Sequence, residues 1–154
     1  MESRRSTLTQ RHIVLGVTGG IAAYKACYLA SRLVQEGAVV DVVMTEAASR
    51  FVAPLTFQAL TQRPVTTDMF HLLAETEIGH VSLAESADIM VIAPATANTI
   101  AEMALGLAND MVTTTALATT APLVLAPAMD YKMWENPATQ ENVRRLRERG
   151  AFIV

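Results

Sequence analysis

The chain has 154 residues, of which 51% are hydrophobic and 18% charged, and this composition excludes an intrinsically disordered protein. The formal net charge is −3, so we expect no nucleic-acid partner. The single cysteine, Cys27, excludes a disulfide framework and a cysteine-rich zinc site, and it is typical of a protein in the reducing cytoplasm. A chain of this length buries enough apolar surface to fold without a metal, so we expect no metal site.

Residues 1–11 are predicted to form a polar N-terminal tail, and residues 12–154 to form one domain. The tail lacks the apolar stretch of a signal peptide. No apolar run in the chain approaches the ~18 residues of a membrane span. We therefore expect a soluble cytoplasmic protein that does not contact a membrane.

Apolar runs and segments of helical periodicity alternate along this domain. The runs predict strands at residues 12–17, 38–44, 88–93, 122–126 and 151–154. The periodic segments predict helices at 21–35, weakly from 45, and at 54–62, 81–87, 96–107, 111–119 and 137–149. Strands that are apolar on both faces and alternate with helices indicate a parallel sheet covered on both sides. We predict a three-layer α/β/α, Rossmann-like (flavodoxin-like), doubly wound parallel sheet.

Ligands of such sheets bind where the strands end at their carboxyl ends, so four loops become candidates for a site. The first loop, Thr18-Gly19-Gly20, joins a strand to a helix and therefore offers backbone N–H groups to an anion. It is neither a G-x-G-x-x-G motif nor a P-loop. Glycines of a tight turn without any ligand explain this pattern equally well.

The second and third loops carry hydroxyl and amide side chains. Thr45 follows the second strand, where its hydroxyl either caps the next helix or touches a ligand, and the cap is the simpler interpretation. Phe51 suits the core as well as a pocket wall. In the third loop, Thr96, Asn98 and Thr99 share one turn, and since a helix needs one N-cap, at least one of them exceeds the needs of structure.

The fourth loop and one histidine complete the candidates. The loop carries an acid, Asp130, a base, Lys132, and the only tryptophan, Trp134. Methionine and tryptophan in a loop more often fold back on the core than bind a ligand. His80 opens a predicted helix, whose N-terminus favours the neutral imidazole that suits a general base. A core or capping histidine is the alternative. From these residues alone, the sequence indicates an anion- or nucleotide-binding α/β domain.

Taken together, the loops are more specific than any one of them. They read GVTGGIAAYK at 16–25, MTEAA at 44–48, GH at 79–80, APATANT at 93–99, ND at 109–110 and PAMDYKM at 127–133. In this order they resemble the flavin-dependent cysteine decarboxylases, the HFCD flavoproteins. Within that family they are most similar to the phosphopantothenoylcysteine decarboxylase domain of the bifunctional coenzyme A biosynthesis proteins. The resemblance extends over residues 12–154.

The resemblance implies an FMN-dependent carboxy-lyase that converts 4′-phosphopantothenoylcysteine to 4′-phosphopantetheine in coenzyme A biosynthesis. In that chemistry FMN oxidises the cysteine side chain towards a thioaldehyde, and the carboxylate then leaves as CO2. The resemblance also implies a homotrimer or homododecamer with the flavin at a subunit contact. A phosphopantothenate–cysteine ligase, fused or separate, is the implied partner.

Residues that match the family motifs are the expected site residues. His80 would be catalytic, and Asp130 and Met133 would bind substrate. The residues expected to bind FMN, the first four of them around its phosphate, are Gly19, Gly20, Ile21, Ala22, Thr45, Phe51, Thr96, Ala97, Asn98, Thr99 and Ala128.

Two features depart from the family pattern. Asp130 stands where the family usually has Asn, and an ionised Asp would repel a substrate carboxylate. Asp130 is therefore protonated, contacts another group, or marks a different thiol substrate such as a peptidyl-cysteine. The family's Gly-rich substrate clamp with its cysteine is expected beyond residue 154, since Cys27 does not match it and instead suits a small buried apolar residue. A non-catalytic flavin-binding subunit is the remaining alternative.

Overall fold

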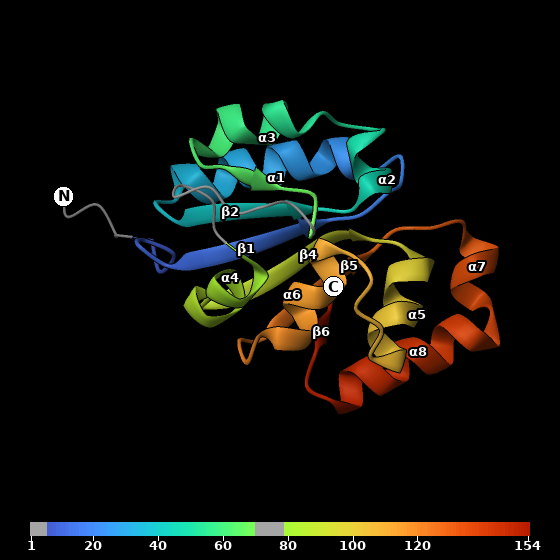
Figure 1. Ribbon diagram of the computed structural model, residues 1–154. Helices are drawn as coiled ribbons and strands as arrows, with labels where there is room; N and C mark the ends of the chain where they lie inside the picture. The colour runs from blue at the N-terminus through green and yellow to red at the C-terminus, as the bar shows by residue number, and fades with distance from the viewer. Residues whose placement is uncertain (1–5, 70–78) are drawn as a thin grey trace.

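The computed structural model describes residues 6–69 and 79–154. Its centre is one parallel sheet with the strand order β3-β2-β1-β4-β5-β6 (Figure 1). This order is that of the dinucleotide-binding folds, and it confirms the predicted doubly wound α/β architecture. The strands are β1 (His12–Val17), β2 (Val39–Met44), β3 (Val65–Thr66), β4 (Ile89–Ala95), β5 (Leu123–Pro127) and β6 (Phe152–Ile153).

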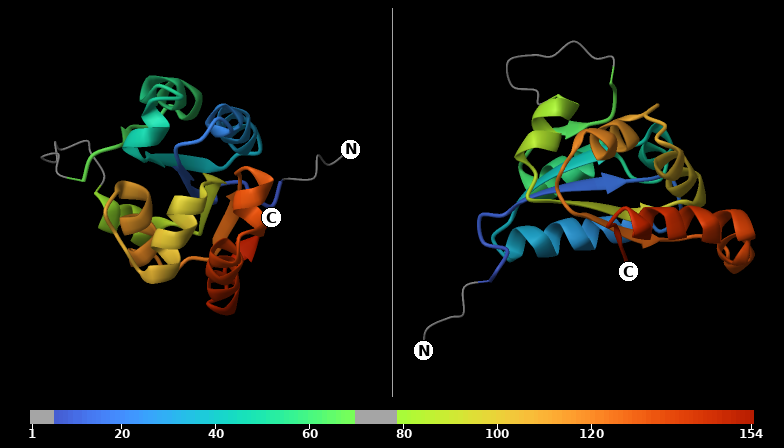
Figure 2. Two further views of the ribbon diagram at one scale, coloured as in Figure 1. Left: turned by 90° about the vertical axis from the view of Figure 1, so that its right-hand side faces the viewer. Right: turned by 90° about the horizontal axis from the view of Figure 1, so that it is seen from below.

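Helices form a layer on each side of the sheet (Figures 1 and 2). They are α1 (Ala23–Gln35), α2 (Glu46–Ser49), α3 (Pro54–Thr61), α4 (His80–Ser86), α5 (Ala97–Leu105), α6 (Met111–Ala118), α7 (Tyr131–Glu135) and α8 (Pro137–Glu148). Helices α1 and α3 pack together on one face, and α4, α5, α6 and α8 cover the other. In the part of the chain that the structure describes, no helix is both long and apolar enough to cross a membrane.

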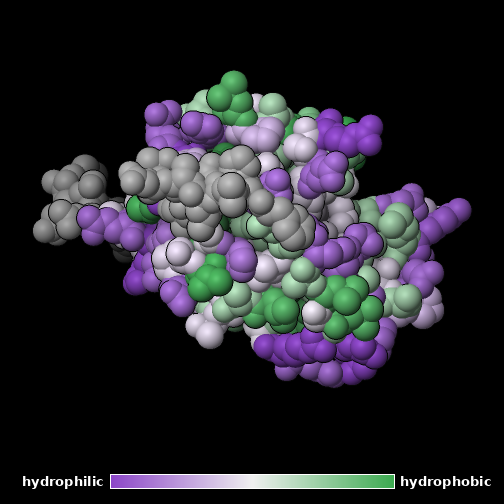
Figure 3. All heavy atoms as spheres, viewed as in Figure 1, coloured by the Kyte–Doolittle hydropathy of each residue, from purple (hydrophilic) through white to green (hydrophobic). Residues whose placement is uncertain are grey.

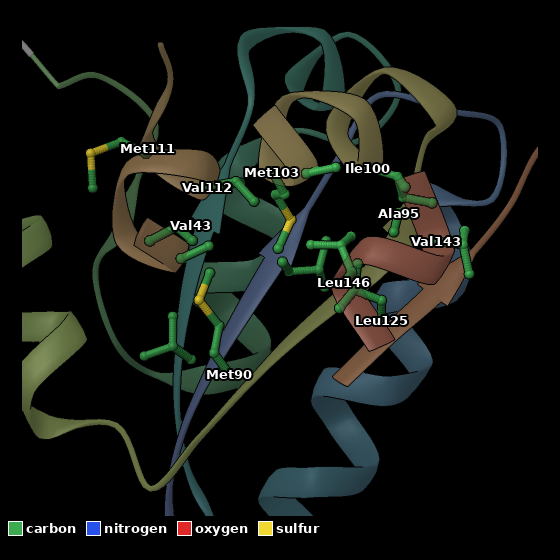
Figure 4. Packing of buried hydrophobic residues seen from close by; sticks show 14 of the residues in the cluster. Val43, Met90, Ala95, Ile100, Met103, Met111, Val112, Leu125, Val143 and Leu146 are labelled. Atoms are coloured by element: carbon green, nitrogen blue, oxygen red, sulfur yellow. The ribbon is translucent and has the colours of Figure 1, made fainter. Parts of the chain in front are cut away.

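Alternation along the strands produces two apolar cores, one on each face. On β1, Leu15 and Val17 point to the core that includes Phe57 of α3, whereas Val14 joins the opposite core. Figure 4 shows part of that second core, in which Met90 and Leu125 from neighbouring strands lie below the helices. Both cores contain mainly aliphatic residues and methionine, as the low aromatic content of 5% requires.

Two elements lie outside the predicted set. Strand β3 has only two residues, too few for any periodicity, and it exists because it pairs with Val42 and Val43 of β2. Helix α7 begins at Asp130, within the predicted fourth loop, and Asp130 Oδ1 accepts a hydrogen bond of 2.9 Å from Lys132 N at its start. Trp134 of α7 packs against the core, as the simpler interpretation of this loop expects.

Candidate functional site

A cavity lies between β1 and β4, at the switch point of the sheet. Strands β2 and β3 are added on one side of this point, and β4, β5 and β6 on the other. The cavity has a volume of about 950 Å³, within the range of about 300–1,000 Å³ typical of small-molecule sites. Loops that follow β1, β2, β4 and β5 line it, as the rule for open parallel sheets predicts. The lining residues are Gly19, Gly20, Ile21, Ala22, Thr45, Glu46, Ala47, Thr96, Ala97, Asn98, Thr99, Asn109, Asp110, Ala128, Met129, Asp130 and Met133.

The structure brings together every predicted site residue except two. Phe51 lies in the turn after α2 with 52% of its surface exposed, and His80 is the first residue of α4. Neither side chain lines the cavity of a single copy. The four predicted loops therefore line one cavity, while their role as a binding site and the chemical roles of their residues remain predictions.

Thr18 is a site-supporting residue that the sequence analysis did not single out. Its buried hydroxyl donates to Pro94 O at 2.6 Å and accepts from Thr96 N at 3.1 Å. One side chain therefore joins the loop after β1 to the loop after β4 across the reversal point. The sequence shows only a threonine between a strand and a glycine pair. It does not reveal the partners of that threonine, because they lie more than seventy residues away along the chain.

Side-chain caps explain two of the polar residues at the cavity. Thr45 Oγ1 accepts from Ala48 N at 3.1 Å, so it caps α2. Thr96 Oγ1 accepts from Thr99 N at 3.2 Å and caps α5. Asn98, the polar residue that exceeds the needs of capping, donates to Glu102 Oε1 at 2.6 Å. The capping interpretation of Thr45 is thus confirmed, and Thr96 is the residue of the third loop that caps a helix. Both residues also line the cavity.

Residues on the far wall were not among the predicted site residues. Asp110 forms a capping box with Thr113 at the start of α6. Asn109 beside it also lines the cavity. Their proximity to the other loops arises from the packing of α5 against α6 rather than from any pattern in the sequence.

Helix α1 differs from the other helices around the cavity because no side chain caps it. Its N-cap is Ala22, whereas Thr45, Thr96, Asp110 and Asp130 cap α2, α5, α6 and α7. The first N–H groups of an α-helix have no partner within the helix, and they carry the positive end of its dipole. The uncapped start of α1 therefore offers the cavity a place for an anion.

Gly19 is required by close packing at this point. A Cβ there would lie 2.4 Å from Ala47 Cβ and 2.9 Å from the backbone carbon of Ala47. At Gly20, by contrast, a Cβ would meet nothing nearer than Thr96 Cγ2 at 3.7 Å. The first glycine lets the loop after β1 lie directly against Ala47 of α2, and both residues line the cavity.

Charged residues on the lining are all acidic. Glu46, Asp110 and Asp130 line the cavity, and no lysine or arginine is among its lining residues. An anionic ligand would therefore be held by backbone N–H groups rather than by a basic side chain. Cys27 lies in α1 and packs against the core, where burial raises the pKa of its thiol, so it fits the predicted small apolar role.

The fold and the cavity define a doubly wound α/β protein with a cavity of small-molecule size at the switch point of its sheet. The sequence model of the Flavoprotein family matches residues 1–154, and the chain belongs to this family. A curated relative, the coenzyme A biosynthesis bifunctional protein CoaBC of Vibrio cholerae, is 51% identical over 144 residues. That match covers 94% of this chain and 36% of the relative, so the chain spans about a third of the length of the relative.

Solved structures give the same result. The FMN-dependent cysteine decarboxylase SpaF matches with a TM-score of 0.86 and 37% identity, over 96% of this chain and 85% of SpaF. A PPC decarboxylase mutant complexed with pantothenoylaminoethenethiol matches with a TM-score of 0.79 and 31% identity, over 94% of this chain and 81% of that protein. The predicted family is therefore confirmed.

Proposed function

We propose that this chain binds FMN and decarboxylates 4′-phosphopantothenoylcysteine to 4′-phosphopantetheine in coenzyme A biosynthesis. The carrying observation is the cavity at the switch point, which collects the motif residues of four separate loops. The similarity to CoaBC and to PPC decarboxylase supports the choice of substrate.

The cavity volume suits a ligand of the size of FMN. The charged side chains of the described lining are acidic, so the uncapped start of α1 is the feature that favours a phosphate. Gly20 N, Ala23 N and Lys25 N already donate to backbone carbonyls, which leaves the neighbouring N–H groups and the positive end of the helix dipole for the anion. We propose that Gly19, Gly20, Ile21 and Ala22 hold that phosphate. Thr45, Ala128 and the loop from Thr96 to Thr99 would then surround the remainder of the flavin.

Bound FMN would accept two electrons from the thiol-bearing side chain of the substrate and would return them to the enethiol left after CO2 departs, so that the overall reaction is redox-neutral. The chain itself would orient the substrate against the flavin and exclude water from the reacting group. The proposed substrate contacts are Asp130, the N-cap of α7, and Met133 within that helix. Asp130 Oδ1 accepts one hydrogen bond from Lys132 N, and a carboxylate oxygen has two lone pairs, so both oxygens of Asp130 can still accept from a substrate group.

We propose that the site is completed at a contact between copies, in a homotrimer or homododecamer. Phe51 and His80 match family motifs but lie outside the cavity of one copy, which supports a contribution from a neighbouring copy. A phosphopantothenate–cysteine ligase, fused or separate, would supply the substrate. A cytoplasmic location is supported by the single cysteine, which is not in a disulfide.

The absorption spectrum of the purified protein tests the cofactor, and CO2 release from phosphopantothenoylcysteine tests the reaction. Oxidised-flavin bands together with CO2 release would establish both. Bands without CO2 release would remove the substrate assignment, and a peptide with a C-terminal cysteine would then be assayed, since SpaF is a cysteine decarboxylase. A colourless protein that also fails to bind added FMN would remove the enzyme assignment.

His80→Asn tests the proposed catalytic residue. Asn retains hydrogen-bonding groups but cannot act as a base, so we expect flavin to stay bound while CO2 release falls by at least about a hundredfold, the usual contribution of acid–base catalysis. Phosphopantothenoylcysteine turnover by this variant at the rate of the parent protein would exclude His80 from the mechanism.

A further inference from the structure

A second cavity lies at the amino ends of the strands, whereas the proposed flavin site lies at their carboxyl ends. The volume of this second cavity is about 450 Å³, and it shares no lining residue with the first cavity. It opens between the C-terminal ends of α5, α6 and α8 and the beginnings of β5 and β6. Its lining residues are Met103, Gly106, Leu107, Thr113, Ala116, Leu117, Thr119, Thr120, Ala121, Pro122, Leu123, Leu146, Arg149, Gly150, Ala151 and Phe152.

Apolar side chains dominate this second cavity and its rim. Leu107, Leu117 and Phe152 expose 50%, 62% and 63% of their surfaces. Figure 3 shows hydrophobic atoms over α5 and α6, next to the hydrophilic band of α8. Large apolar side chains that are exposed around a hollow mark a place where an apolar group binds.

Among the described residues that line this cavity, Arg149 is the only charged one. Arg144 and Arg145 of the same helix pair with Glu141, whereas no carboxylate in the described part of the chain pairs with Arg149. Its one side-chain hydrogen bond, from Nη1 to Met103 O, is long at 3.4 Å. Most of the guanidinium donors of Arg149 are therefore free for a ligand.

The other polar side chains of the lining are largely occupied within the protein. Thr113 belongs to the capping box of α6, and Thr119 Oγ1 donates to Ala84 O at 2.9 Å. The cavity thus combines one unpaired cation with an apolar interior and contains no acid. That combination matches a carboxylate head on an apolar chain, because a guanidinium binds a carboxylate through two parallel hydrogen bonds.

We propose that this second cavity is a binding site for a small amphipathic carboxylate, with its head on Arg149 and its apolar chain between α5, α6 and β5. The proposal stands on the second cavity alone and does not depend on the reaction at the first. The ligand belongs to the class of medium-chain fatty acids and similar carboxylates. Octanoate is a suitable probe, and 1-octanol is its uncharged counterpart.

Isothermal titration calorimetry of the intact protein tests the site. We expect octanoate to bind, and each methylene added from butanoate to octanoate to strengthen binding about threefold to fourfold while it is buried. Arg149→Gln should weaken octanoate binding at least about tenfold, because a charged hydrogen bond is lost, and should leave 1-octanol binding unchanged. Arg147→Gln, an exposed arginine of the same helix that does not line the cavity, is the matched control and should bind octanoate normally.

Thr120→Trp provides an independent variant. Thr120 is exposed and lines the cavity, so a tryptophan there fills the mouth without disturbing the core, and it should abolish binding of both probes. Unchanged thermal unfolding of each variant shows that its fold is intact. Absence of octanoate binding to the parent protein, or equal affinity in Arg149→Gln, would overturn the proposal. Undiminished binding in Thr120→Trp would overturn it as well, since the ligand would then lie elsewhere on the molecule.

Discussion

At the scale of single residues, Thr18 connects two loops that the sequence separates widely. Thr18→Val keeps the size of the side chain but leaves Pro94 O and Thr96 N without their partner. We expect the free energy of unfolding to fall by about 1–3 kcal/mol for each buried group that loses its hydrogen bond. Urea denaturation measures this loss. Thr18→Ser retains the hydroxyl and should recover most of the lost stability; equal losses in Ser and Val variants would refute the role of the hydroxyl.

The two glycines of the first loop provide a matched pair at the same scale. Gly19→Ala places a methyl group against the Ala47 backbone, which cannot move as a flexible side chain would. Overpacking of this kind costs about 1–3 kcal/mol, and displacement of the loop should also weaken FMN binding. Gly20→Ala has free space and should change stability little. Unfolding with and without FMN, together with flavin titration, separates the two effects; a Gly19→Ala variant that matches Gly20→Ala would contradict the packing argument.

At the scale of elements, a buried carboxylate holds the strands together at the edge away from the flavin cavity. Asp41 of β2 is 2% exposed, accepts from Arg63 Nε at 2.7 Å before β3, and also contacts His12 Nε2 of β1. The hydrogen bond with Asp41 raises the pKa of the Arg63 guanidinium. His12 Nδ1 lies 3.0 Å from Ser86 O at the end of α4, so one cluster joins β1, β2, the turn before β3 and α4.

Asp41→Asn removes the carboxylate charge of this cluster and leaves Arg63 without its counter-ion. Breaking a buried ion pair typically costs about 3–5 kcal/mol, and we expect the lower end of this range because Arg63 remains partly exposed. Glu36→Gln, which breaks the exposed pair with Arg32 within α1, is the control and should cost less than about 1 kcal/mol. Chemical denaturation of both variants makes the comparison, and a similar loss in each would argue against the buried cluster as a stabilising feature.

At the scale of the whole molecule, the sheet keeps the two cavities apart. Carboxyl ends of the strands form the proposed flavin site, and the second cavity lies at the amino ends of β5 and β6. Helix α5 reaches both, because Thr96 and Thr99 lie at its start and Met103 near its end. Ligands at the two cavities would therefore contact opposite ends of the same helix.

Local patterns in the sequence were sufficient for most elements and for the position of the site. Alternating apolar strands and periodic helices are local signals, and the carboxyl-end rule for parallel sheets then identified the four loops. Capping residues such as Thr45 and Thr96 lie within reach of sequence patterns, because the capping oxygen and the backbone N–H that donates to it are only three residues apart. Short elements were not: β3 exists through pairing with β2, and α7 lies in a segment without a clear period.

By itself, the sequence determined the fold class, the family and the loops that form the site, because each of these depends on residue patterns within short segments. Only the tertiary structure decided which residues meet across those segments. It joined Thr18 to the loop after β4, placed Asp110 on the cavity wall, and left Phe51 and His80 outside the cavity of one copy. It also left Arg149 unpaired beside a second cavity. These are contacts between residues far apart in the chain, and packing, not local propensity, sets their geometry.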